Sequence, residues 1–159
     1  MFKRHQGFSL IELLIVVSII GIIASIAIPN LLAAKRAANE GSAQASLRTI
    51  HSCEIAYQAT TGVGDYADIA ALSVSLLTDA VLGSGTKSGY SFVAHPTAVG
   101  VRPALYYATG VPTTISGVGA TGTRRFGISE DGAIRGDSSA PLTAYADEAA
   151  VRAAPGVGN

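Results

Sequence analysis

The hydropathy pattern is dominated by one continuous apolar run near the N-terminus. Residues 8–28 read FSLIELLIVVSIIGIIASIAI and contain a single charged residue, Glu12. An α-helix rises about 1.5 Å per residue, so this run would be about 30 Å long, which matches the hydrocarbon core of a bilayer. We therefore expect a membrane-crossing helix, and Lys3 and Arg4 before it predict that its N-terminal end stays in the cytoplasm.

A second periodic pattern follows directly in the alanine-rich residues 30–59. Its apolar side chains recur at steps of three and four residues, which is typical of an amphipathic helix. The members of this stripe are Ala43, Leu47, Ile50, Cys53 and Tyr57. We expect one long helix whose second half packs this stripe against a small sheet, with Cys53 as a small buried side chain.

The remaining residues predict strands and turns. Residues 67–82 are compatible with one or two short helices, and GSGTKSG marks a turn. Residues 90–96 alternate as a half-buried strand does, and residues 104–110 read as a second strand. Residues 124–136 read as a hairpin whose turn uses Gly132. Three or four antiparallel strands packed on one helix make an α+β fold. The small, polar tail from Asp137 would wrap the head or extend from it.

Composition changes this picture little. The 159 residues carry 11 basic and 11 acidic side chains, so there is no basic excess of the kind that a nucleic-acid partner requires. The chain has one cysteine and therefore no intramolecular disulfide.

The apolar run has three interpretations. A secretory signal peptide could be cut after Ser25-Ile26-Ala27, but the proline at position 29 is an unfavourable neighbour. A plain membrane anchor leaves Glu12 unexplained, except as a protonated and tolerated acid. Cleavage between Gly7 and Phe8 would create an amine one helical turn from Glu12, in its own chain or in an adjacent copy. That pairing would offset the cost of an acid at membrane depth.

The stretch Gly7-Phe8-Ser9-Leu10-Ile11-Glu12, after a short basic leader, resembles the prepilin signature of the type IV pilin superfamily, and the similarity continues through Gly21, Pro29 and Asn30. The resemblance implies that a membrane peptidase cuts after Gly7 and methylates the Phe8 amine. It also implies that Glu12 pairs with a neighbouring Phe8 amine during assembly. Proline and glycine weaken helices, so Gly21 and Pro29 are candidates for a segment that loosens in the filament; a simple bend is the alternative.

The implied organisation is a removed leader (1–7), an assembly helix (8–28), its amphipathic continuation (29–59) and a globular head (60–159). The implied function is a structural, non-enzymatic subunit of a type IV pilus. Its partners would be other copies of itself, membrane lipid, the prepilin peptidase, an inner-membrane assembly platform and an outer-membrane secretin. It would reside in the inner membrane and then in a surface filament. The alternatives are a pseudopilin of a type II secretion system, or a single-pass anchored binding or enzymatic domain.

No motif for catalysis, cofactor or metal stands out. Residues 117–122 match G-x-G-x-x-G but lack the flanking strand and helix of a dinucleotide site, so we expect a loop. The three histidines (His5, His51, His95) are far apart, and Asp65, Asp68 and Asp79 lack EF-hand spacing. We expect no catalytic residue, cofactor or metal. Many pilins close their C-terminal region with a disulfide. The C-terminal region of this chain must be held in another way, because the chain has one cysteine.

Overall fold

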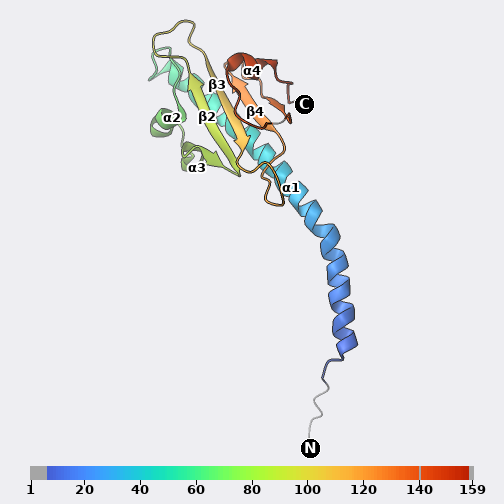
Figure 1. Cartoon of the computed structure of the whole chain (residues 1–159). Coiled ribbons are helices and arrows are strands. Elements are labelled where there is room, and N and C mark those ends of the chain that lie inside the picture. Colours follow the sequence, from blue (N-terminus) through green and yellow to red (C-terminus); the bar gives the residue numbers. More distant parts are fainter. Residues whose placement is uncertain (1–6, 140, 158–159) are drawn as a thin grey trace, which may run out of the picture. The chain divides into compact units, whose positions relative to one another are not determined.

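The computed structural model describes residues 7–139 and 141–157. The predictions for the leader, including Lys3, Arg4 and His5, fall on residues 1–6 and lie outside the described residues. The chain divides into two compact units, residues 1–35 and 36–159. Helix α1 (Leu10–Ala59) begins in the first unit and ends in the second (Figure 1). We call the second unit the head.

The head combines helices with one antiparallel sheet, so the α+β prediction is confirmed. After α1 come α2 (Ile69–Ser75) and α3 (Ala80–Gly83), and then the strands β1 (Thr86–Lys87), β2 (Tyr90–Pro96), β3 (Tyr106–Pro112), β4 (Arg125–Ser129) and β5 (Arg135–Asp137), followed by α4 (Glu148–Ala153). The sheet has five strands in the order β1-β2-β3-β4-β5. The predicted count of three or four was wrong because the two-residue β1 pairs with β2 without showing any alternation of its own.

The apolar stripe of α1 packs on one face of the sheet. Ala43, Leu47 and Ile50 are fully buried against the sheet residues of the core cluster, whose largest members are Tyr90, Phe92, Tyr106, Phe126 and Ile128. Cys53 and Tyr57 pack against this cluster but are only partly buried, so the predicted burial of Cys53 is confirmed in part. The predicted packing of the helix on the sheet is confirmed.

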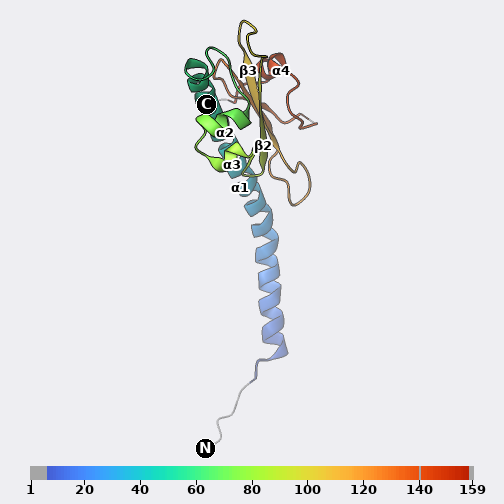
Figure 2. The ribbon, with the colours of Figure 1, turned by 90° about the vertical axis from the view of Figure 1, so that its left-hand side faces the viewer.

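The two faces of the sheet are covered by different helices, which Figure 2 shows most clearly. Helices α1, α2 and α3 lie on one side and α4 on the other. Gly127 in β4 marks the contact with α4, because a Cβ atom there would lie 2.9 Å from a methyl group of Val151. The absence of a side chain at Gly127 therefore lets α4 approach the strand closely.

The C-terminal segment is held by backbone pairing and burial in place of a disulfide. Gly136 N donates to Pro155 O at 3.0 Å, and Val157 N donates to Ile134 O at 3.1 Å. Val151 is fully buried and Tyr145 nearly so. The tail therefore wraps the head, which is the first of the two predicted possibilities.

Candidate functional site

The residues predicted to be processed precede the first turn of α1. Gly7, Phe8 and Ser9 lie outside regular structure, and Phe8 is 84% exposed. A Cβ atom at Gly7 would meet nothing within 4 Å, and its backbone is not in the left-handed region. Among the described residues, neither packing nor backbone conformation requires glycine at this position.

Glu12 makes a contact that the sequence prediction missed. Ser9 N donates to Glu12 Oε2 at 2.8 Å, and Ser9 O accepts from Leu13 N, which makes Ser9 the N-cap of α1. This is one half of a capping box, in which a glutamate three residues after the cap satisfies the backbone of the cap. The S-x-x-E spacing of Ser9 and Glu12 is the signal that could have revealed it. Glu12 therefore has a role within its own chain besides any role between chains.

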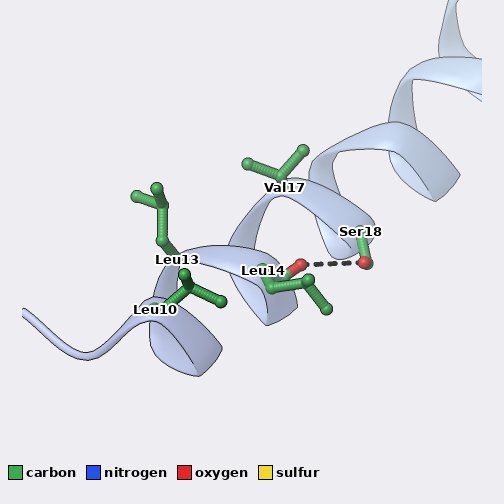
Figure 3. A pocket seen from close by; sticks show the side chains of 5 residues that line it. All are labelled: Leu10, Leu13, Leu14, Val17 and Ser18. Atoms are coloured by element: carbon green, nitrogen blue, oxygen red, sulfur yellow. Dashed lines mark hydrogen bonds between the residues drawn. The ribbon is translucent and has the colours of Figure 1, made fainter.

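The first turns of α1 present an unpartnered apolar surface. Figure 3 shows an open groove lined by Leu10, Leu13, Leu14, Val17 and Ser18. Ser18 Oγ donates to Leu14 O at 2.8 Å, so its hydroxyl is satisfied by its own helix. The large apolar side chains from Leu10 to Leu31 are 48–80% exposed. Such a surface requires lipid or another helix as its environment.

Helix α1 meets the physical requirements for a membrane span. It contains an 18-residue window of mean hydropathy 2.8, none of which is buried in the structure. The helix continues without a break through Gly21 and Pro29, and a Cβ atom at Gly21 would meet nothing within 4 Å. The prediction was that the helix loosens between Gly21 and Pro29 in an assembled filament. The single chain does not test it, so it stays a prediction.

The other polar residues that the sequence singled out are dispersed through the head. Residues 117–122 lie in the loop between β3 and β4, as predicted. The element directly after them is strand β4, whereas a dinucleotide site would have a helix there. Nδ1 of His51 shares a hydrogen bond with the hydroxyl of Tyr106, and the ring of His95 stacks on Tyr107 at 4.7 Å between centroids. Asp65, Asp68 and Asp79 each bind the nearby chain: an ion pair with Arg102, the cap of α2, and the cap of α3. Among residues 7–139 and 141–157, no three His, Cys, Asp or Glu side chains gather as metal ligands would.

One buried acid was not anticipated. Glu54 is fully buried on α1; its Oε2 accepts from Ala67 N at 3.0 Å, and its Oε1 has no hydrogen-bond partner. Burial raises the pKa of Glu54 from 4.5 to about 7, the Ala67 hydrogen bond opposes this rise, and the negative charge of Asp68 adds to it. The acid lies beside Cys53 and just off the predicted stripe, where the segment after α1 covers it.

This buried acid predicts an unusual dependence of stability on pH. The folded chain binds the Glu54 proton more tightly than the unfolded chain, so its contribution is fully present below pH 4.5 and is lost as the pH rises to about 7. The loss corresponds to about 3 kcal/mol of unfolding free energy. We expect Glu54→Gln to remove this loss. Thermal unfolding of both proteins in detergent, followed by circular dichroism between pH 4.5 and 8, measures the difference.

The comparison at pH 4.5 is the control, because Glu54 is then neutral in the folded wild-type chain and only half ionised in the unfolded one, so that little of the loss has occurred. Other acids, such as Asp131 with its lowered pKa of about 2, affect the wild type and the variant equally. A stability difference between the two proteins that stays constant from pH 4.5 to pH 8 would contradict the assignment.

The N-terminal segment is similar to known proteins. Residues 2–28 match the model of the prokaryotic N-terminal methylation motif. The chain is 43% identical over 51 residues to the type IV major pilin protein PilA of Myxococcus xanthus, and 46% identical over 56 residues to the type IV wide pilus major component PilA4 of Thermus thermophilus. These matches support the predicted resemblance to the type IV pilin superfamily.

The chain is also similar to a component of a secretion system. It is 35% identical over 52 residues to the type II secretion system core protein G of Dickeya chrysanthemi. The three matches cover 32%, 35% and 33% of this chain, and 23%, 43% and 34% of the relatives. The chain thus matches less than half the length of each of these relatives. No solved structure matches the chain.

Proposed function

We propose that this chain is a structural subunit of a type IV pilus, without enzymatic activity of its own. The observation that supports this best is the exposed apolar surface of α1, most of which lies within the methylation motif of residues 2–28. Stored as a monomer, this surface lies in lipid; in a filament, the same surface packs against the helices of other copies. Exchange of lipid for helix contacts requires no new chemistry in the head.

The proposal assigns a role to each segment. Residues 1–7 are a cytoplasmic leader that the prepilin peptidase removes after Gly7, and the Phe8 amine is then methylated. Residues 8–28 hold the subunit in the inner membrane with the head outside, and residues 29–59 continue the helix into the head formed with residues 60–159. An inner-membrane platform and an outer-membrane secretin would pass the subunit to the surface.

Glu12 is the residue that we assign to assembly. In a filament its carboxylate meets the Phe8 amine of an adjacent copy, and the pair fixes the axial offset between subunits. Both groups are desolvated among apolar helices, and each would be costly there without the other. The Ser9 N–H that Glu12 accepts is a local bond; the second carboxylate oxygen stays available for the amine.

The first experiment is the intact mass, with N-terminal fragmentation, of the protein in material sheared from cells. We expect a chain that starts at Phe8, carries one extra methyl group, and is abundant in the sheared fraction. A chain that starts at Met1 and is found only in membranes would contradict the proposal. That result would favour a single-pass anchored domain.

A pseudopilin of a type II secretion system is the second candidate function, because one relative is a secretion core protein. Its processing at Gly7 and Phe8 would be the same, so the mass alone does not distinguish the two. Abundance does: a pilus subunit is a major protein of the sheared fraction, whereas a pseudopilin stays with the cell envelope. Deletion of the gene would correspondingly remove surface filaments or block secretion.

A further inference from the structure

The segment that connects α1 to α3 carries α2 and contributes no strand to the sheet. Helix α2 lies on the same side of the sheet as α1 (Figure 2). Apolar side chains bury the segment on the core cluster, namely those of Ile69, Leu72 and Leu77. We call residues 67–78 the α2 flap.

The residues that border the α2 flap are pinned by ion pairs. Asp65, shortly before it, pairs with Arg102 of the β2–β3 loop and accepts from Gly100 N at 3.2 Å. Asp79, directly after it, accepts from Lys87 Nζ at 2.7 Å and caps α3. The hydrogen bonds from Arg102 and Lys87 hold the pKa of these two carboxyls below its usual value, so both stay charged at neutral pH. Motion of the flap is therefore local, between two anchored ends.

Two adjacent residues of α1 hold the α2 flap by polar contacts. Glu54 Oε2 accepts from Ala67 N at 3.0 Å near one end of the flap. Cys53 Sγ donates to Leu76 O at 3.8 Å near the other end. A thiol is a weak donor, so the bond to Glu54 is the stronger of the two.

Glu54 holds the flap with one carboxyl oxygen and leaves the other without a partner. The side chain is fully buried, and its Oε1 makes no hydrogen bond. The ion pairs of the described residues do not include Glu54. A carboxylate in this place would be buried without a balancing charge, which costs more than burying the neutral acid. The closed flap therefore favours the protonated form of Glu54.

The titratable groups that surround Glu54 favour the same form. They are Cys53 and His51 on α1, Tyr66 and Asp68 on the segment that leads into α2, and Tyr106 on β3. After burial, which has the larger effect, the negative charge of Asp68 raises the pKa of Glu54. Burial lowers the pKa of His51, so this ring is uncharged at neutral pH. Among the described residues, this environment therefore supplies no cation that would stabilise the Glu54 carboxylate.

We propose that Glu54 is a proton-controlled latch for the α2 flap: the neutral acid keeps the flap closed on α1, and loss of its proton releases the flap. Opening brings the Glu54 carboxylate into water, where it is stable. It also uncovers Cys53 and the apolar side chains that α2 buries. The latch concerns the head alone and does not rest on the proposed function.

Opening of the flap increases as the pH rises. The closed form holds the Glu54 proton with a pKa of about 7, whereas the exposed acid has a pKa of 4.5. The closed form is therefore favoured in acid and loses this advantage as the pH rises to about 7 and above. Between pH 5 and pH 8, the open population should grow on the order of 100-fold.

Hydrogen exchange of the full chain in detergent, read by mass spectrometry at pH 5 and pH 8, tests the latch. After correction for intrinsic exchange rates, the protection of amides in the α2 flap is expected to fall on the order of 100-fold. Peptides from β3 and β4 should lose much less protection, because the anchored ends keep the opening local. In Glu54→Gln the flap should keep its protection, because the amide oxygen still accepts from Ala67 N and the side chain cannot ionise.

Glu40→Gln is the matched control. Glu40 is also a buried acid of α1, but it pairs with Arg124 and accepts from Thr123 in the β3–β4 loop. This variant should loosen that loop and leave the pH response of the α2 flap as it is in the wild type.

The thiol of Cys53 gives a second readout. Its labelling by iodoacetamide should rise more steeply from pH 5 to pH 8 in the wild type than in Glu54→Gln. Without a latch the order would be reversed, because burial and then the charge of Glu54 raise the pKa of the Cys53 thiol and so slow its reaction.

Three exchange results would each overturn the latch. They are constant protection of the flap in the wild type, an equal fall in the flap and in the strands, and the same fall in Glu54→Gln. An equal fall throughout the head would show that Glu54 acts on global unfolding alone. None of these results bears on the proposed pilus subunit, which the mass of the sheared material tests separately.

Discussion

Replacing Glu12 with glutamine is expected to abolish filaments while the chain still inserts in the membrane. Removal of one partner from a buried pair leaves the Phe8 amine uncompensated, at a cost of about 3–5 kcal/mol in each subunit. Electron microscopy and immunoblotting of sheared material measure filaments, and membrane fractionation measures insertion. We expect no detectable filaments, an unchanged amount of membrane protein, and normal cleavage after Gly7.

Glutamine is the informative replacement because Glu12 also caps α1. Its amide oxygen can still accept from Ser9 N, as glutamine does in capping boxes, while the negative charge is lost. Glu12→Leu removes both the cap and the charge. Normal filaments from Glu12→Gln together with failure of Glu12→Leu would assign the residue to the cap alone, and the pairing with Phe8 would have to be abandoned.

The helices and central strands could be predicted because their signals are local. The apolar run and the three- and four-residue stripe predict α1 to its observed end at Ala59. Residues 90–96 alternate, and the structure places β2 at the same seven residues. In the β4–β5 hairpin, Gly132 has a φ of 72°, the positive value that the predicted turn requires. Each of these elements depends mainly on the periodicity or turn chemistry of its own residues.

Elements whose signal lies elsewhere in the chain were missed. The two residues of β1 form a strand only because β2 turns back beside them. Helix α4 is only six residues long, too short to show a helical periodicity, and its one buried residue, Val151, packs against Gly127 of β4. Glu54 is buried because the segment after α1 folds over it, which no helical periodicity reveals.

The candidate site at Gly7, Phe8 and Glu12 stays a prediction from the sequence. Its residues lie within one short stretch, and the chemistry of a new amine near an acid depends on sequence spacing alone. The capping bond of Glu12 follows from a local signal too, the S-x-x-E spacing of Ser9 and Glu12. Contacts between copies depend on which surfaces the fold exposes, which sequence spacing does not give.

Replacing Gly7 with leucine is expected to prevent cleavage almost completely. The full chain should accumulate in the membrane with Met1 at or near its start, and sheared filaments should disappear. This substitution should not disturb the structure, because a Cβ atom at Gly7 would meet nothing within 4 Å among the described residues and the backbone there is not left-handed. We therefore expect a loss of cleavage to arise from the peptidase, if that enzyme accepts only glycine directly before the cut. Mass spectrometry of the membrane fraction reads the N-terminus directly.

Gly41→Ala is the matched control for this experiment. Gly41 is also exposed, also has open space around its Cβ position, and lies within α1. Alanine there stabilises the helix by about 0.5–1 kcal/mol and leaves the N-terminus untouched. We expect this variant to be cleaved as the wild type is. Full cleavage and normal filaments from Gly7→Leu would show that glycine is not read at this position, and the processing assigned to Gly7 and Phe8 would be wrong. Loss of cleavage in both variants would instead point to a general effect on the helix, because only Gly7 borders the predicted cut.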